Sequence, residues 1–178
     1  MDKIVSAEKR FAMMTANGFN EAEFITLQKA IMAKHAQSKI ISSNVGLVHS
    51  DPKTGNGISY AVDYALSETL AVDYDSLIVI GGDKHIEMLS DEPHAIRLVR
   101  AFLRESMPIL FVGKGSILLD IIGDKRFSGL PNNDEKLVKL ESAYWSVDGL
   151  CLPNVFNEFY EMVHARESVK AEKNGVAA

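Results

Sequence analysis

The sequence predicts an α/β domain in which helices cover both faces of a mainly parallel β-sheet. Wholly apolar runs at residues 77–80 and 109–112 are typical of strands that are buried on both faces. Amphipathic segments alternate with these runs, as in a chain that crosses repeatedly from strand to helix. Glycine turns follow three of the expected strands, at Gly18, Gly81-Gly82 and Gly113. Ligands in such sheets bind beyond the carboxyl ends of the strands, so we expect a site where these turns converge.

The first expected elements form one βαβ unit. An apolar strand at residues 11–15 is followed by Asn20 and Glu23, which have the spacing of a capping box at the start of a helix. Helical periodicity then continues to about Lys34, and a second strand is expected at residues 38–43.

The remaining elements follow from turn residues and apolar spacing. The turn-rich loop 51–57 lies between apolar segments 47–49 and 58–62, which predicts either a β-hairpin or a loop excursion. Asp91-Glu92-Pro93 marks the start of a helix. Further along the chain we expect a strand at 109–112, a short helix at 116–122, a polar stretch at 124–134, strands at 137–140 and 143–147, a turn at Asp148-Gly149 and a helix around 155–163.

The composition favours one domain. We expect a polar lead-in at residues 1–8, a single domain at 9–167 and a frayed, disordered tail at 168–178. The net charge of −5 argues against nucleic-acid binding, and no stretch approaches the roughly 20 apolar residues of a membrane span. Cys151 is the only cysteine, and no secretory signal is evident, so we expect a cytoplasmic protein.

Three motifs carry a resemblance to a known superfamily. They are Gly18-Phe19-Asn20-Glu21-Ala22-Glu23, the run from Tyr74 to Gly82 (YDSLIVIGG), and the helix–proline–strand–turn run of residues 96–119; Val147-Asp148-Gly149 adds a weaker match. From about residue 9 to 163 the chain resembles the ThiJ/PfpI superfamily of class I glutamine amidotransferase-like proteins. The resemblance implies a flavodoxin-like fold, that is, a three-layer α/β/α sandwich.

The chain departs from the superfamily pattern at the turn after residue 112. Active members carry a cysteine there, usually followed by histidine and glycine, and these positions correspond to Gly113, Lys114 and Gly115. Glycine cannot supply a thiolate, and lysine is a poor base near neutral pH. The Gly-Lys-Gly sequence is similar to the carboxy-terminal domain of large-subunit catalases, which lacks the cysteine. The superfamily's acid corresponds to Glu23, and the resemblance also implies a homodimer and a stress-related role.

Each candidate residue has a functional and a structural interpretation. Glu23 is either a retained site carboxylate or only the capping-box acid of the helix. Lys114 either forms a Schiff base or binds an anion, or it is a solvated turn lysine. Ser116 is expected to N-cap a helix rather than act as a nucleophile, and Cys151 to be a core residue.

The histidines are scattered, without the spacing of a metal site. His85 follows Gly82, so it either rims the crevice or lies on the surface. Tyr144 and Trp145 are expected in the core or at an interface rather than as a stacking platform.

These residues support three hypotheses about function, none of which requires a metal or cofactor. The first is a non-catalytic protein with a stress-related binding, chaperone-like or regulatory role. The second is a hydrolase, lyase or amidase that uses Glu23 as acid and base and Lys114 as electrostatic partner. The third is a small-anion or metabolite binder that uses residues of the strand-end crevice, namely Gly81, Gly82, His85, Gly113, Lys114 and Gly115.

Overall fold

The computed structural model describes residues 8–127, 137–146 and 152–176. Its strands are β1 (Arg10–Met14), β2 (Gln37–Ser42), β3 (Leu47–His49), β4 (Ser59–Ala61), β5 (Tyr64–Ala65), β6 (Ser76–Val79), β7 (Ile109–Val112), β8 (Leu137–Leu140) and β9 (Ala143–Ser146). Its α-helices are α1 (Glu21–Ala33), α2 (Asp83–Ser90), α3 (Pro93–Arg104), α4 (Ile117–Ile122) and α5 (Leu152–Val176). Short 3₁₀ turns are η1 (Leu66–Glu68), η2 (Ala71–Asp73), η3 (Gly113–Ser116) and η4 (Lys125–Phe127).

Seven strands form one sheet in the order β5-β2-β1-β6-β7-β9-β8. All neighbouring strands are parallel except β8, which pairs antiparallel with β9. The mainly parallel sheet predicted from the sequence is therefore confirmed. The chain moves outward from β1 to β2 and then crosses to β6 on the other side of β1. This reversal between β1 and β6 is where such sheets bind ligands.

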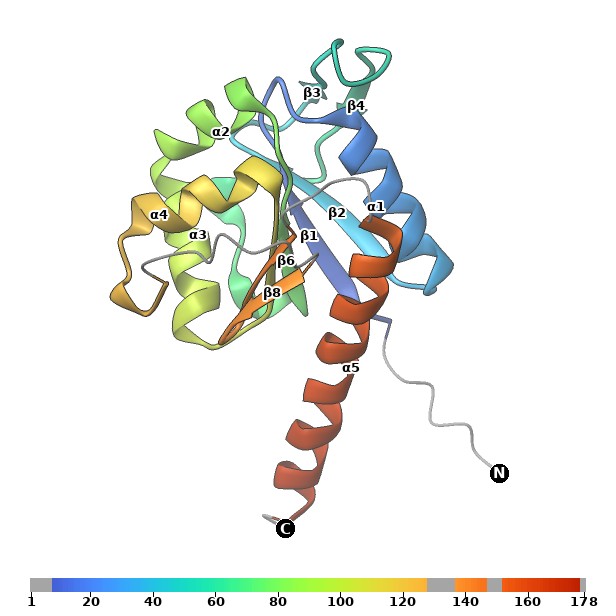
Figure 1. Ribbon diagram of the computed structural model, residues 1–178, viewed down its shortest axis with the longest axis vertical. Coiled ribbons are helices and arrows are strands. Elements are labelled where there is room, and N and C mark those ends of the chain that lie inside the picture. Colours follow the sequence, from blue (N-terminus) through green and yellow to red (C-terminus); the bar gives the residue numbers. More distant parts are fainter. Residues whose placement is uncertain (1–7, 128–136, 147–151, 177–178) are drawn as a thin grey trace.

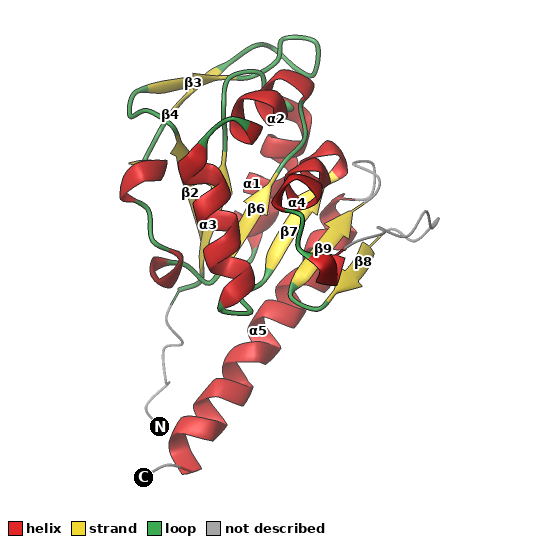
Figure 2. Cartoon of the chain, turned by 90° about the vertical axis from the view of Figure 1, so that its left-hand side faces the viewer, coloured by secondary structure: helices red, strands yellow, loops and turns green. Residues whose placement is uncertain are grey.

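Helices cover both faces of the sheet and give three layers (Figures 1 and 2). Alternate residues of each central strand point to opposite faces, so there are two hydrophobic cores. In β1, Phe11 and Met13 pack with α1 and α5, whereas Ala12 and Met14 belong to the core beneath α2, α3 and α4. The expected three-layer α/β/α sandwich is confirmed.

Most local predictions agree with the structure. The side-chain oxygen of Asn20 accepts the backbone N–H of Glu23 at 3.1 Å and caps α1. Strands β3 and β4 form the expected antiparallel hairpin around loop 51–57. Glu92 caps α3 through the backbone N–H of His94, with Pro93 as the first helical residue.

Several elements differ from the sequence-based predictions. Helix α2 was not predicted, because its eight residues bury only His85, Ile86 and Leu89 and therefore show little apolar periodicity. The short strand β5 and the turns η1 and η2 were also missed. Helix α5 continues to Val176, into the segment 168–178 that was expected to fray, and projects from the body of the protein (Figure 1).

Four predictions lie wholly or mostly outside the described ranges: the polar lead-in at residues 1–8, the polar stretch 124–134, the turn at Asp148-Gly149 and the core placement of Cys151. Among the described helices, none combines the length and apolar character needed to cross a bilayer.

Candidate functional site

The three glycine turns meet at one edge of the sheet, because β1, β6 and β7 are neighbours. A Cβ atom on Gly82 would lie 2.5 Å from the carbonyl oxygen of Gly18, so these two turns are in direct contact. The backbone N–H of Asn20 donates to the carbonyl of Gly81 at 3.0 Å and ties the start of α1 to the end of β6. The expected convergence is confirmed, and we call residues 18–23, 81–83 and 113–116 the strand-end site.

The carboxylate of Glu23 lies inside this site rather than completing the capping box. Its Oε2 accepts the backbone N–H of Gly81 at 2.8 Å, whereas the N–H of Asn20 donates to the carbonyl of Gly81. Only the Asn20 half of the capping box is therefore formed. Burial raises the pKa of Glu23, and the hydrogen bond from Gly81 partly opposes this shift. The geometry agrees with the interpretation of Glu23 as a site carboxylate.

Gly113 faces the same carboxylate across open space. Its φ of +51° lies in the left-handed region, at the sharp turn from β7 into η3 and α4, which we call the elbow. A Cβ at this position would lie 3.7 Å from Oε1 of Glu23, and no other atom of the described residues beyond its chain neighbours would lie within 4 Å of it. A side chain at residue 113 would therefore project beside Glu23.

Two side chains fix the elbow by donating to the carbonyl of Gly113. They are the hydroxyl of Ser116 at 3.0 Å and the indole nitrogen of Trp145 at 3.2 Å. Ser116 occupies the predicted N-cap position of α4, but its hydroxyl donates to the carbonyl of Gly113 and makes no cap hydrogen bond. Trp145 packs at the edge of one core, as expected, but its role at the elbow was not foreseen.

The other glycines of the site allow close packing of the backbone. A Cβ on Gly115 would lie 2.4 Å from the carbonyl oxygen of Val79, so η3 packs directly on the end of β6. A Cβ on Gly81 would lie 3.1 Å from Oε2 of Glu23. Their predicted binding role remains a prediction, and the packing alone requires a small residue at Gly115.

Lys114 forms an ion pair with Asp83 at the start of α2. Its side chain is 61% exposed. The interpretation as a solvated turn lysine therefore agrees with the structure. The sequence did not reveal Asp83 as its partner, because the two residues are 31 positions apart.

His85 is fully buried, so both sequence-based placements, at the rim of the crevice and on the surface, are wrong. The backbone N–H of Ala16 donates to its Nδ1 at 2.8 Å, and Nε2 lies 3.1 Å from the carbonyl of Ile80. Since Nδ1 accepts, Nε2 carries the proton and the ring is neutral. Burial lowers the pKa of His85 to about 4, and the nearby carbonyl groups of Ala16 and Ile80 partly oppose this shift. His85 joins β1, β6 and α2 beneath the site.

A second buried carboxylate, Glu21, holds the loop above the site and was missed from the sequence. Its Oε2 accepts the hydroxyl of Ser50 at 2.8 Å and the backbone N–H of Gly57 at 3.0 Å. Burial opposes ionisation, but hydrogen bonds from Ser50 and from the loop backbone prevail and lower the pKa of Glu21. The density of turn residues in loop 51–57 was the only available signal, because a turn needs an acceptor for its N–H groups.

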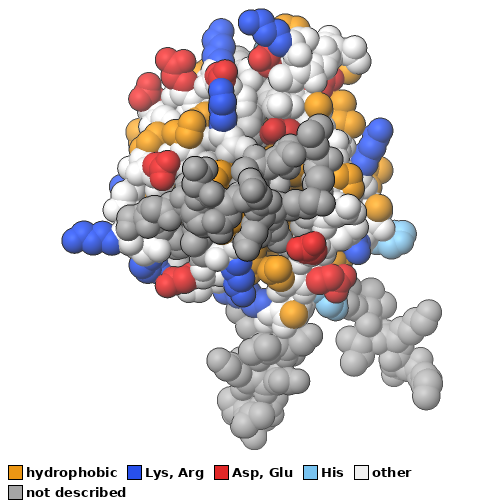
Figure 3. Space-filling model, viewed as in Figure 1, with side chains coloured by type: hydrophobic (Ala, Val, Ile, Leu, Met, Phe, Trp, Pro, Cys, Tyr) orange, Lys and Arg blue, Asp and Glu red, His pale blue; other side chains and the backbone are white. Residues whose placement is uncertain are grey.

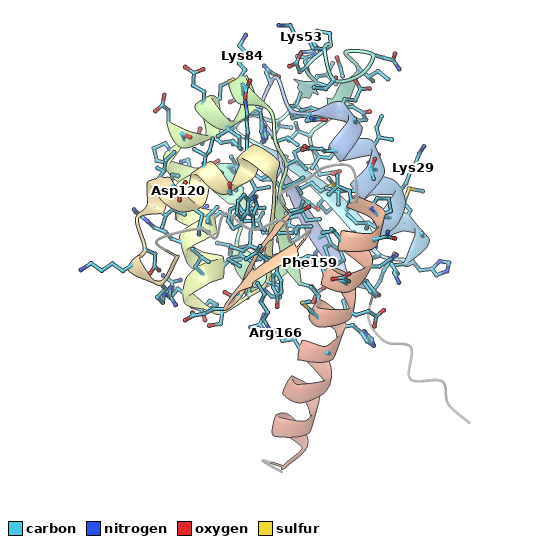
Figure 4. All side chains as sticks on the ribbon, in the orientation of Figure 1. Lys29, Lys53, Lys84, Asp120, Phe159 and Arg166 are labelled. Carbon is cyan, nitrogen blue, oxygen red and sulfur yellow. The ribbon has the colours of Figure 1, made fainter. Side chains whose placement is uncertain are left out.

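A cavity of about 530 Å³ adjoins the strand-end site, at the top of the view in Figure 4, where Lys53 and Lys84 are labelled. Its lining residues are Asn17, Gly18, His49, Ser50, Asp51, Pro52, Lys53, Asp83 and Lys84. The mixture of backbone, hydroxyl and charged groups suits a small polar ligand. In the part of the chain that the structure describes, no group of three acidic, histidine or cysteine side chains is placed to hold a metal ion.

Comparison with known proteins agrees with this architecture. The fold is similar to a ThiJ/PfpI domain protein from Brachyspira murdochii, with TM-score 0.76 and 16% identity over 89% of this chain and 99% of that one. It is also similar to DJ-1 from Schizosaccharomyces pombe (TM-score 0.75, 16% identity, 95% and 99% coverage) and to oxidized DJ-1 from Toxoplasma gondii (0.74, 14%, 95% and 98%). No curated protein sequence matches the chain. Residues 9–154 match the DJ-1/PfpI family, and the chain therefore belongs to that family.

Proposed function

We propose that this protein is a DJ-1/PfpI family member that acts by binding rather than by thiol catalysis. The observation that carries the proposal is the elbow, where residue 113 is glycine and its missing side chain would face Glu23 at 3.7 Å. If Gly113 occupies the family's nucleophile position, the chain has no atom there that can attack a substrate. We expect a stress-related binding, chaperone-like or regulatory role, exercised as a cytoplasmic homodimer.

The strand-end site supports binding of a small polar molecule or anion. The N–H of Gly81 is already committed to Glu23, so an incoming ligand would meet the carboxyl group of Glu23 and the groups that line the adjoining cavity. Because burial raises its pKa, Glu23 takes up a proton at a higher pH than an exposed glutamate does, and the protonated carboxyl group can donate a hydrogen bond to a ligand oxygen. Thermal-shift measurements with small anions test this role, because a ligand that binds the folded state raises Tm.

A hydrolase, lyase or amidase is the second candidate, and the raised pKa of Glu23 is the observation that favours it. In this case Glu23 would act as general acid and base without help from Lys114, whose charge is paired with Asp83. Turnover of methylglyoxal, esters and amides should be measured for the wild type and for Glu23→Gln. A robust rate that Glu23→Gln abolishes would overturn the binding proposal.

Restoring a thiol at the elbow tests the proposal most directly. We expect Gly113→Cys to fold, because the space beside the Glu23 carboxyl is open. Its reaction with iodoacetamide across a pH series reports the thiol pKa, and the wild type, whose only thiol is Cys151, supplies the background. A thiol pKa in Gly113→Cys well below the ordinary value of about 8.5 would indicate that the lost sulfur is what separates this chain from thiol chemistry. A measurable turnover by the wild type that Gly113→Cys does not exceed would refute the proposal.

A further inference from the structure

A second cavity, of about 450 Å³, lies at the opposite end of the sheet from Gly113. It opens where β7 and β9 begin, between the β8–β9 hairpin and α5. The four residues of β7 separate it from the elbow by about 13 Å. Its lining residues are Ser106, Pro108, Lys139, Glu141, Ser142, Tyr144, Met162, Ala165 and Arg166. We call this the hairpin cavity.

Two cations from different elements line the hairpin cavity. Lys139 lies on β8, with its Nζ 5.8 Å from the ring centre of Tyr144, and Arg166 lies on α5 beside the hairpin (Figure 4). Neither has a carboxylate partner within 4 Å among the described residues. Glu141, the acid of the lining, instead lies 3.6 Å from Arg126. Of the three charged side chains that line the cavity in the described part of the chain, two are cations, so this lining carries a net positive charge.

Arg166 is anchored to the protein, but most of its N–H donors take no part in that contact. It is half-buried, and one of its terminal nitrogens donates to the carbonyl of Glu105 at 3.2 Å. Burial lowers the pKa of Arg166, although the guanidinium stays charged at neutral pH. Four of its five N–H donors have no hydrogen bond to the described protein atoms, and a guanidinium pairs best with a planar or tetrahedral oxyanion through two parallel bonds.

Backbone strain is concentrated at the rim of the hairpin cavity. Ser106, with φ +52°, and Glu141, with φ +54°, are two of the three non-glycine residues with positive φ in the described chain. Each costs about 1–2 kcal/mol relative to a residue without a Cβ. Ser106 ends α3 at a position where glycine is usual, with its N–H bonded to Leu103 and that of Met107 bonded to Phe102. Ser106 and Glu141 therefore occupy positions at which glycine would make the protein more stable.

We propose that the hairpin cavity binds a small organic anion, a carboxylate or phosphate monoester attached to an apolar body. Arg166 and Lys139 would neutralise the charged group, and the hydroxyls of Ser106 and Ser142 offer further donors. Pro108, Tyr144 and Met162 supply apolar walls for the rest of the ligand. At the lower edge of the body in Figure 3, hydrophobic side chains adjoin both basic and acidic ones. This site is separate from the strand-end site and does not depend on its function.

Calorimetric titration with phenyl phosphate and with benzoate tests the proposal. We expect saturable binding of at least one of them, with a Kd near or below about 1 mM. Arg166→Gln and Lys139→Gln should each weaken binding at least about tenfold, and Arg166→Lys should weaken it less than Arg166→Gln. Benzyl alcohol, a neutral analogue, should bind more weakly than benzoate. The control is Lys29→Gln, which removes an exposed lysine on α1, away from the cavity (Figure 4).

The ligands also separate the two forms of the anion. Tighter binding of phenyl phosphate assigns the site to phosphate monoesters, and tighter binding of benzoate assigns it to carboxylates. Absence of saturable binding by either compound overturns the proposal. So does binding that Arg166→Gln and Lys139→Gln leave unchanged, or that Lys29→Gln weakens to the same extent. Circular dichroism of each variant establishes that the fold is retained.

Discussion

Two glycines of the elbow should respond very differently to the same substitution. Among the described residues beyond its chain neighbours, a methyl group on Gly113 would meet only Oε1 of Glu23, at an ordinary contact distance of 3.7 Å. The cost of Gly113→Ala is therefore that of its φ of +51°, about 1–2 kcal/mol, partly offset by a less flexible unfolded chain. We expect a net loss of about 1 kcal/mol. A methyl group on Gly115 would lie 2.4 Å from the carbonyl oxygen of Val79, whereas ordinary contacts begin at 3.4 Å. The backbone must move by about 1 Å, and we expect a loss of about 3 kcal/mol or more.

Urea unfolding followed by far-UV circular dichroism measures both losses. In thermal scans, 1 kcal/mol corresponds to about 2–4 °C in a chain of this length, so Tm should fall by about 3 °C for Gly113→Ala and about 9 °C for Gly115→Ala. Gly123→Ala is the matched control, because Gly123 also has positive φ (+65°) and no atom within 4 Å of its missing Cβ. It should behave like Gly113→Ala. If Gly113→Ala proves as destabilising as Gly115→Ala, the space beside Glu23 is not open and the reasoning about the site fails.

Three further predictions concern the groups beneath and around the site. His85 has a folded pKa of about 4 against about 6.5 unfolded, so its contribution to stability is complete above pH ~6.5 and is lost as the pH falls toward 4. The free energy of unfolding should drop by about 2 kcal/mol more between pH 7 and pH 5 in the wild type than in His85→Gln; parallel profiles would contradict a buried neutral ring. Glu21→Gln should speed hydrogen exchange at the amide of Gly57 while core amides stay protected, and unchanged exchange there would show that the carboxylate does not hold the loop. Ser116→Ala and Trp145→Phe each remove a hydrogen-bond donor to the carbonyl of Gly113, and each should lower the free energy of unfolding by about 1 kcal/mol, measured by urea unfolding. If the losses simply add in the double variant, the two side chains do not act together at the elbow.

The predicted and observed sites differ most at Glu23, whose carboxylate could accept a hydrogen bond either from the start of its own helix or from a distant segment. The sequence places Glu23 three residues after Asn20, which predicts reciprocal capping, yet the carboxylate binds the N–H of Gly81, 58 positions away. The bond to Gly81 is possible because β6 ends beside the start of α1. A capping motif in the sequence does not reveal which distant segments lie next to the helix. The same limit explains why Asp83 was missed as the partner of Lys114.

Burial was also misjudged where a polar residue interrupts an apolar pattern. His85 was placed at the crevice or on the surface because histidine is commonly exposed, but two backbone groups from separate strand ends satisfy its ring nitrogens. Helix α2 was missed for a related reason: its buried stripe is short and includes this histidine. In both cases tertiary hydrogen bonds compensate for a burial that local propensity does not predict.

The sequence alone determined the βαβ unit, the hairpin, the apolar strands and the glycine turns, because periodicity, caps and turn residues act over only a few positions. It also determined that residue 113 carries no side chain. Only the tertiary structure decided that the turns after β1, β6 and β7 meet, that Glu23 faces Gly113, and that Lys139 and Arg166 share a cavity. These three arrangements depend on strand order and on the packing of distant segments. No local sequence pattern encodes the distance between residues that lie far apart in the chain.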